Sequence, residues 1–306
     1  MIVGSTLGAL KHMDTETAFS LLQELGVKTV ELGVGGYVDT THANPKVLCH
    51  SGNAVRRLKE QLEAHDLRIS ALSCCGNPVH PDRSVAAAHH QDFVNACHLA
   101  QALGADTIVS FSGCPGDSAS SKAPNFISTR WPDDFQTVLD WQWERVLIPY
   151  WREAAAIAAS YGIRRIAIEM MPGFCVYNPQ TLWRLRDEIG SAIGATVDPA
   201  HLIRQGIDPA TAIRALKGAV FQVHAKDLLF CTDARNENGV MSTDSHASPF
   251  STRAVGNGHE SAYWRGIVKA LSDIGYDRSL TVEYEDDVVP INDGLPLAVK
   301  AVMKLL

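Results

Sequence analysis

Residues with metal-ligand chemistry stand near the ends of four apolar runs in the second half of the sequence. These runs read RIAIEMMPG, ATVDPAH, FQVHAKD and LTVEYED, and they contain Glu169, Asp198, His224 and Glu283. Burying such groups is costly unless a ligand or metal compensates. Three carboxylates and one imidazole suit Mn²⁺ best, with Mg²⁺, Co²⁺ or Zn²⁺ as alternatives. Each residue alone is equally well explained as a structural acid or buried histidine, but the four together predict a divalent-metal site.

Further polar residues near strand ends are candidates for catalysis or substrate binding. His201 follows Asp198 by three residues, and Lys226 and Glu285 each lie two residues beyond another candidate ligand. Side chains two apart on a strand share a face, so we expect these groups at the mouth of the site. Less specific candidates, which local loop hydrogen bonds or ion pairs explain equally well, are Glu31, Asn77, His80, Arg253, Asn257 and His259.

The elements that must position these residues alternate along the chain. Eight short runs rich in β-branched and apolar residues are predicted strands, at 2–5, 29–32, 68–74, 107–112, 165–170, 194–198, 220–226 and 279–285. Segments with helical spacing follow them, at 16–25 with Thr15 as cap, 52–65, 85–103, 135–161, 179–189, 209–215, 261–274 and 294–306. Strand–helix alternation repeated eight times predicts an α/β fold, a single (β/α)8 TIM barrel domain over residues 1–306.

Two connections are longer than ordinary turns. Residues 113–134 follow the fourth predicted strand, and residues 228–259 follow the seventh. Both are rich in polar residues, and active sites of such barrels lie at this end of the strands. We expect both to be active-site loops that form walls or lids; a disordered segment or an oligomer contact is the alternative.

Composition limits the class of protein. The chain has 306 residues, is 46% hydrophobic and carries a formal charge of −7. An acidic surface does not favour nucleic-acid binding, which needs a basic stripe. The sequence shows neither a signal peptide nor a run of apolar residues long enough to span a membrane. Seven cysteines without paired metal-site spacing indicate reduced thiols. We expect a cytoplasmic protein with a small-molecule partner.

Taken in order, seven motifs resemble one family. They are GVKTVELG, SCCGNPVHP, VSFSGCPG, EMMPGFCVYNP, DPAHLIRQGIDP, VHAKD and VEYEDD. With these motifs the chain resembles the xylose isomerase-like TIM barrels, described as sugar phosphate isomerases and epimerases, over essentially its whole length.

The resemblance implies a chemistry for the candidate residues. The four ligands would hold a metal that polarises a sugar carbonyl and stabilises an enediolate. Glu169 and Glu283 would also serve as catalytic groups. His201 would hold a substrate oxygen, and Lys226 or Glu285 would assist proton transfer.

Two positions depart from the family pattern. Sugar 3-epimerases of this family carry a second glutamate six residues after the first ligand, where this chain has Cys175. Relatives that read EMHPG have a histidine where this chain has Met171. Metal binding is unaffected by either change, whereas the type of reaction is left open.

The first hypothesis is a metal-dependent sugar isomerase or epimerase acting on an unphosphorylated keto sugar or sugar derivative, as a homo-oligomer. The alternative is a lyase, similar to inosose dehydratases or to C-glycoside deglycosidases, and the latter would need a small partner subunit. A DNA-repair endonuclease of related fold would need several metal-binding histidines and a basic groove. A non-catalytic binding barrel is a further alternative.

Overall fold

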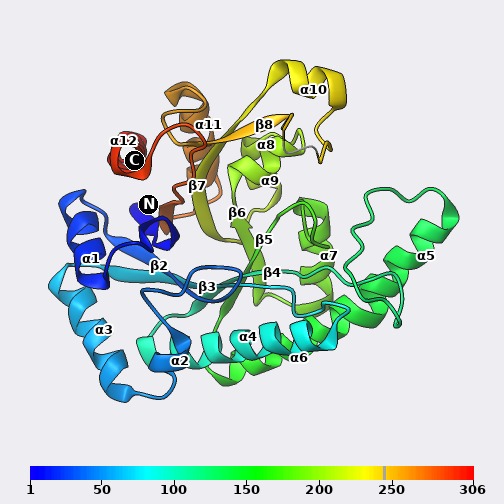
Figure 1. The fold of residues 1–306 in the computed structure, drawn as a ribbon, viewed down its shortest axis with the longest axis horizontal. Helices are drawn as coiled ribbons and strands as arrows, with labels where there is room; N and C mark the ends of the chain where they lie inside the picture. The colour runs from blue at the N-terminus through cyan, green and yellow to red at the C-terminus, as the bar shows by residue number, and fades with distance from the viewer. Residues whose placement is uncertain (244–245) are drawn as a thin grey trace. The chain divides into compact units, whose positions relative to one another are not determined.

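The computed structural model describes residues 1–243 and 246–306. Two compact units are distinguished within the chain. The first comprises Met1–Glu31, Gln61–Ser70 and Val197–Leu306, and the second comprises Leu32–Glu60 and Ala71–Thr196. Figure 1 shows the order of the elements by colour and label.

The second unit is built on parallel strands. Its strand order follows the sequence, with β4 paired to β3 on one side and to β5 on the other, and β5 paired to β6. These strands are β3 (Arg68–Cys75), β4 (Thr107–Phe111), β5 (Arg165–Glu169) and β6 (Ile193–Val197). Glu169 is the last residue of β5, in register with Phe111 and Thr196. The register therefore sets Glu169 at the carboxyl end of this sheet.

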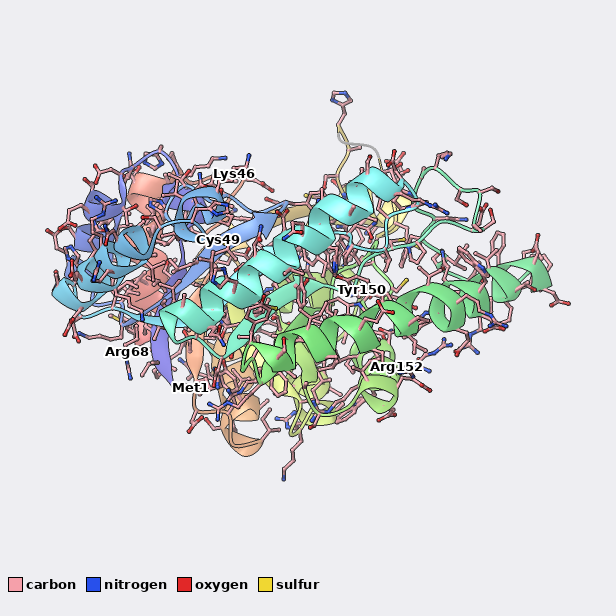
Figure 2. The ribbon with its side chains drawn as sticks, turned by 90° about the horizontal axis from the view of Figure 1, so that it is seen from below. Met1, Lys46, Cys49, Arg68, Tyr150 and Arg152 are labelled. Atoms are coloured by element: carbon pink, nitrogen blue, oxygen red, sulfur yellow. The ribbon has the colours of Figure 1, made fainter. Side chains whose placement is uncertain are left out.

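Helices connect these strands. They are α2 (Pro45–Leu48), α3 (Gly52–Ala64, shared with the first unit), α4 (Arg83–Leu103), α5 (Asp133–Trp141), the π-helix η2 (Gln142–Leu147), α6 (Ile148–Ser160) and α7 (Pro179–Ile189). Figure 2 labels Tyr150, which lies on α6. The Tyr150 ring lies edge-on to His90 of α4, with 5.9 Å between the ring centroids. Trp151 is buried on α6 and donates a hydrogen bond from Nε1 to the Ser112 carbonyl at 2.9 Å. This contact ties α6 to the loop that follows β4.

The first unit carries the other parallel strands. Strand β1 (Ile2–Thr6) pairs with β2 (Thr29–Gly36) and β9 (Ser279–Val282), and β9 pairs with β7 (Val220–Phe230). Strand β8 (Phe250–Ala254) is antiparallel to β7. The remaining elements are η1 (Gly8–Leu10), α1 (Thr15–Glu24), α8 (Pro199–Arg204), α9 (Pro209–Ala215), α10 (Thr232–Asn238), α11 (Ser261–Asp273) and α12 (Ile291–Met303). Among the described elements, eight strands run parallel to a neighbour, as predicted.

Several predicted boundaries were wrong. Asp14, rather than Thr15, caps α1, because its carboxylate accepts from the Thr17 amide at 2.9 Å. The predicted helix 135–161 corresponds to a continuous helical run over 133–160, in which α5, the π-helix η2 and α6 follow one another without a break. Pro149 stands in the first turn of α6, where its missing N–H requires no intrahelical partner, and a π-turn precedes it.

The two long connections differ in structure. Segment 113–134 is irregular until α5 begins at Asp133. Segment 228–259 was predicted as a loop, but β7 continues to Phe230, followed by α10 and by β8, which returns along β7. Its residues 244–245 lie outside the described part of the chain. Among the described helices, none is both long and apolar enough to cross a bilayer.

Candidate metal centre

Asp198 is held at the junction of β6 and α8. Its Oδ1 accepts a hydrogen bond from the Ala200 amide at 2.8 Å, so the side chain caps the helix. Pro199 occupies the first helical position, where no amide donor is needed. The other oxygen, Oδ2, lies 3.3 Å from Nε2 of His201, and the side chain is fully buried. Capping thus uses one oxygen and directs the other into a cluster of ionisable groups.

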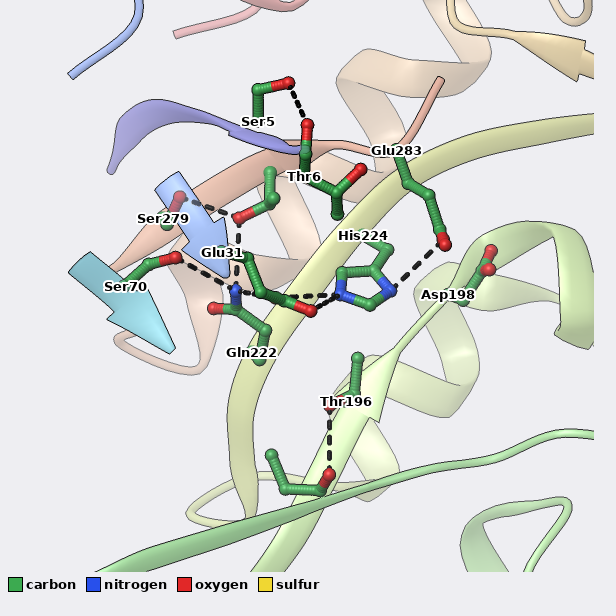
Figure 3. A network of polar contacts seen from close by, with 12 residues as sticks. Ser5, Thr6, Glu31, Ser70, Thr196, Asp198, Gln222, His224, Ser279 and Glu283 are labelled. Carbon is green, nitrogen blue, oxygen red and sulfur yellow. Dashed lines mark hydrogen bonds and ion pairs between the residues drawn. The ribbon is translucent and has the colours of Figure 1, made fainter. Parts of the chain in front are cut away.

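His224 lies on the face of β7 that also carries Gln222 and Lys226, because side chains alternate along a strand. Its Nε2 lies 3.0 Å from Oε2 of Glu31 (Figure 3). Gln222 Nε2 donates to the same Glu31 oxygen at 2.6 Å. On the other side of the ring, Nδ1 lies 3.2 Å from Oε2 of Glu283. The Glu31 carboxylate favours a proton on Nε2, which leaves the Nδ1 lone pair facing Glu283.

Lys226 brings a positive charge among the same carboxylates. Its Nζ lies 3.0 Å from Asp198 Oδ2 and 2.8 Å from Glu283 Oε2. The more exposed Glu285 lies 3.7 Å away. Only 5% of the Lys226 side chain is exposed, so these carboxylates supply the countercharge that a buried ammonium requires.

The four predicted ligands are brought together. One ligand atom from each of Glu169, Asp198, His224 and Glu283 lies within 4.8 Å of the other three. Glu169, Asp198 and His224 are buried, and Glu283 is partly exposed. This is a buried acidic and histidine cluster that could bind a metal.

The donor set fits a divalent cation. His224 Nδ1 and Glu283 Oε2 lie 3.2 Å apart, and a divalent cation can replace the proton that such a pair shares, because metal binding requires the unprotonated forms of both groups. Three carboxylates around a single histidine also carry more negative charge than Lys226 alone neutralises. Oxygen donors with one nitrogen fit Mn²⁺, Mg²⁺, Co²⁺ or Zn²⁺.

Two of the predicted substrate-binding residues border this cluster. His201 is 14% exposed and contacts Asp198, as described above. Partial burial raises the pKa of the Glu285 carboxyl, Lys226 opposes that shift, and Glu283 adds to it. A carboxyl with a raised pKa beside an ammonium is suited to proton transfer.

Glu31 contacts His224 and Gln222, and the substrate contact predicted for it stays a prediction. The side chain is 1% exposed, and its carboxylate is engaged by His224 and Gln222. Such a carboxylate fixes the tautomer and orientation of a metal-binding histidine. We therefore assign Glu31 as a positioning residue behind the cluster.

Asn77 and His80 have structural partners in the loop after β3. The Asn77 side chain donates to the Cys114 carbonyl at 2.9 Å and accepts from the Cys114 amide at 3.0 Å. Nδ1 of His80 accepts from the Asp82 amide at 2.9 Å. These bonds hold loops in place; a contact with substrate stays a prediction for both residues.

Arg253 and His259 also have partners away from the four ligands. Arg253 Nε lies 3.2 Å from Asp286 Oδ1. Nδ1 of His259 lies 2.7 Å from Asp227 Oδ1, and the ring stacks on Tyr263. Asp227 follows Lys226 on β7 and therefore points to the opposite strand face. His259 is thus held on the side of β7 that faces away from Lys226, and its predicted substrate contact remains a prediction.

Three important residues were not singled out from the sequence. Gln222 supports Glu31, and its place two residues before His224 on one strand was an available signal. Asp227 is fully buried and accepts from Trp264 Nε1 at 2.9 Å. Asp286 accepts from the amides of Ala254, Val288 and Val289. Asp227 has partners from a distant segment, His259 and Trp264, which no local pattern reveals. Asp286 combines the nearby Val288 and Val289 amides with the distant Ala254 amide.

Comparison with known proteins identifies the chain's relatives. A model of the family described as "Xylose isomerase-like TIM barrel" matches residues 19–305. A protein of Bacillus subtilis (strain 168), named "Uncharacterized protein YfiH", is 31% identical over 304 residues, which is 97% of each chain.

Solved structures share the fold at lower identity. The probable 3-DHS dehydratase AsbF of Bacillus anthracis matches 99% of both chains with a TM-score of 0.68 and 14% identity. The IolI protein with a bound zinc atom matches this chain over 100% and its own chain over 96%, with a TM-score of 0.68 and 15% identity. A D-tagatose 3-epimerase-like protein covers 99% and 96%, with a TM-score of 0.67 and 20% identity.

The family match confirms the predicted closed barrel of eight parallel strands with helices between them. Because the family model spans nearly the whole sequence, the chain belongs to the xylose isomerase-like TIM barrel family.

Proposed function

We propose that this protein is a divalent-metal-dependent isomerase or epimerase acting on a keto sugar or a sugar derivative. The observation that carries the proposal is the grouping of three carboxylates and one imidazole within 4.8 Å, with Lys226 beside two of them. The D-tagatose 3-epimerase-like structure, which has the same fold, supports this choice.

The metal would be held by Glu169, Asp198, His224 and Glu283, with Mn²⁺ as our first choice. The zinc atom bound to IolI, a protein of the same fold, makes Zn²⁺ the first alternative to test. These four residues would hold the ion, which when bound would supply Lewis-acid stabilisation of negative charge on a substrate oxygen.

The chain's own residues would move the proton. Glu283 is 21% exposed, whereas Asp198 and His224 are 0% and 3% exposed, so its carboxylate is the more accessible to a sugar C–H. Lys226 and Glu285 lie within 3.7 Å of each other, where they can hold a proton beside a substrate oxygen. His201 would donate a hydrogen bond to another hydroxyl. An unphosphorylated substrate is expected, because a phosphate group would need a cation and Lys226 is already paired with the carboxylates of Asp198 and Glu283.

A second candidate function, elimination by a lyase, is favoured by Cys175. Interaction with Cys114, and after it burial, raises the pKa of the Cys175 thiol. Cys175 therefore does not replace a carboxylate base on a second face of the substrate. A lyase needs no such group, because the proton is not returned after a substituent leaves. The fold shared with the probable dehydratase AsbF supports this candidate.

An exchange experiment in deuterated water tests the proposal. The protein loaded with Mn²⁺ is incubated with D-tagatose and related unphosphorylated keto sugars, and products are followed by NMR and mass spectrometry. Deuterium at the carbon next to the carbonyl of recovered sugar, absent with His224→Ala, is the expected result. Loss of water from the sugar would establish the lyase instead. Turnover without exchange or elimination would contradict both and indicate hydride transfer.

The assembly is also part of the proposal. We propose a homo-oligomer, which light scattering of the purified chain tests. A requirement for a co-encoded small protein would identify a deglycosidase rather than an isomerase.

A further inference from the structure

The second unit contains a cavity of about 420 Å³ that none of the four candidate metal ligands lines. Segment 113–134, helix α5 and the π-helix η2 form one wall of it, and the β5–α7 connection and the first half of α7 form the other. Small-molecule sites have volumes of about 300–1,000 Å³. The cavity is therefore large enough for a ligand of monosaccharide size.

Hydrogen bonds within the protein shape both walls of this cavity. Gln142, which is 1% exposed, donates from Nε2 to the Asn125 carbonyl at 2.7 Å. On the opposite wall, the Tyr177 amide donates to Thr181 Oγ1 at 3.0 Å. The rings of Phe126 and Tyr177, one from each wall, meet edge-on with 5.5 Å between their centroids. Walls that the protein's own contacts hold in place lower the entropic cost of binding a ligand.

The charged groups that line this cavity are positive. Arg130 and Arg184 line it, and among its described lining residues there is no aspartate or glutamate. The chain as a whole carries a formal charge of −7, and the metal cluster holds three carboxylates. A guanidinium presents its N–H donors in a planar fork that matches the two oxygens of a carboxylate. The lining therefore favours a carboxylate ligand.

Arg184 is oriented by two neighbours on the π-helix η2. Its guanidinium carbon lies 4.3 Å from the centre of the Trp143 ring, and Trp143 is 2% exposed. Glu144 Oε1 lies 2.8 Å from Nη2 of Arg184, and the Glu144 side chain is 56% exposed. An ion pair this exposed is weak, and a guanidinium has further donors besides Nη2. Arg184 can therefore bind an anion while it keeps both contacts.

Uncharged lining groups suit the rest of a sugar ring. Gln136 and Gln180 line the cavity, and their amides can both donate hydrogen bonds to hydroxyl groups and accept them. The Phe126 and Tyr177 rings add apolar area against which C–H groups can pack. Cations, amides and aromatic rings together match a hydroxylated molecule that carries a carboxylate.

We propose that this cavity is a second binding site, which takes a sugar acid such as an aldonate or a uronate. Arg130 and Arg184 bind the carboxylate, and the amides of Gln136 and Gln180 bind hydroxyl groups. Because Arg130 belongs to segment 113–134 and Arg184 to α7, the bound anion ties the two walls together. The site goes beyond the proposed function, since none of the candidate metal ligands contributes to it.

Isothermal titration of the full chain loaded with Mn²⁺ tests the proposal, with D-glucuronate as the probe and D-glucose as its neutral counterpart. D-glucuronate is expected to bind at least about tenfold more tightly than D-glucose, because only the acid forms charge-assisted hydrogen bonds. Arg184→Gln and Arg130→Gln should each weaken D-glucuronate binding by about tenfold or more. Arg152→Gln is the matched control, since Arg152 is also ion-paired, to Glu188 at 3.6 Å, and does not line the cavity.

The variant Asp198→Asn separates this site from the metal cluster, and it should still bind D-glucuronate. Loss of binding in Asp198→Asn, with no change in either arginine variant of the cavity, would place the ligand at the metal cluster and overturn the proposal. Equal affinities for D-glucuronate and D-glucose would also overturn it. Arg130 is exposed, so Arg130→Gln keeps the test decisive even if Arg184→Gln folds poorly. Because titration measures binding alone, the result does not depend on which sugar the protein converts.

Discussion

Nε2 of His224 lies 3.0 Å from Oε2 of Glu31, and 3% and 1% of the two side chains are exposed. Gln222 holds the same Glu31 oxygen from the other side. The position of the imidazole is therefore set from behind by a carboxylate that was expected to touch substrate. From this arrangement we predict that metal affinity depends on Glu31, which is not among the candidate ligands.

Glu31→Gln is expected to weaken Mn²⁺ binding by about 10-fold to 100-fold, because a neutral amide no longer fixes the His224 tautomer. Isothermal titration with Mn²⁺ measures the change. Glu24→Gln, on the exposed side of α1, is the matched control and should bind as the unmodified protein does. Equal affinities for Glu31→Gln and the control would show that Glu31 does not position the ligand.

Asp198→Asn should abolish tight metal binding while the fold is retained, because Asn keeps the oxygen that caps α8 and loses the charge. Asp208→Asn is the matched control, since Asp208 caps α9 through the Thr211 amide. His224→Ala and Glu169→Gln are expected to behave like Asp198→Asn. Metal content by mass spectrometry and circular dichroism are the measurements. Full metal content in Asp198→Asn would refute its assignment as a ligand.

Lys226→Met is expected to bind Mn²⁺ more tightly, by roughly tenfold, because the ammonium no longer competes for Asp198 and Glu283. Turnover should nevertheless fall by about 100-fold or more, since a proton donor is lost. Lys217→Met, which changes an exposed lysine, controls for the loss of charge elsewhere. Weaker metal binding by Lys226→Met would mean that the lysine supports the metal site instead of opposing it.

Asp286→Ala is expected to destabilise the fold by about 2–3 kcal/mol, because Asp286 accepts bonds from the β8 backbone and from Asn257. Burial would raise the pKa of Asp286, but bonds from the Val289, Ala254 and Val288 amides outweigh burial and lower the pKa to about 2. The unfolded value is about 4. The stabilisation is therefore complete above about pH 4 and is lost as the pH falls towards 2.

Urea unfolding of the wild type and Asp286→Ala between pH 2 and 7 measures this difference. The gap between the two free energies of unfolding should narrow only in the acid range. Asp277→Ala, which removes an exposed carboxylate, should show no such pattern. A gap that is constant across the whole range would contradict the role given to the Asp286 charge.

The local sequence was informative where a residue's neighbours along the chain decide its place. Glu169 is the last residue of a five-residue strand, and Asp198 precedes a proline that starts a helix. The sequence pattern alone therefore predicted that both residues stand at the ends of strands. The start of α1 was placed one residue late because Asp14, which caps this helix, was not compared with Thr15. Strand β8 was missed because it lies within segment 228–259, whose polar composition was interpreted as a single loop.

The sequence by itself determined the alternation of strands and helices, the family and the identity of the candidate ligands. These follow from the spacing of apolar residues, from the position of polar residues at strand ends and from residue chemistry, all of which can be seen in short stretches of the sequence. Tertiary structure decided the neighbours of each charged group: Glu31 lies behind His224, and Lys226 lies among the acids. The physical reason is that hydrogen bonds and ion pairs depend on distances of about 3 Å between residues that are far apart in the chain.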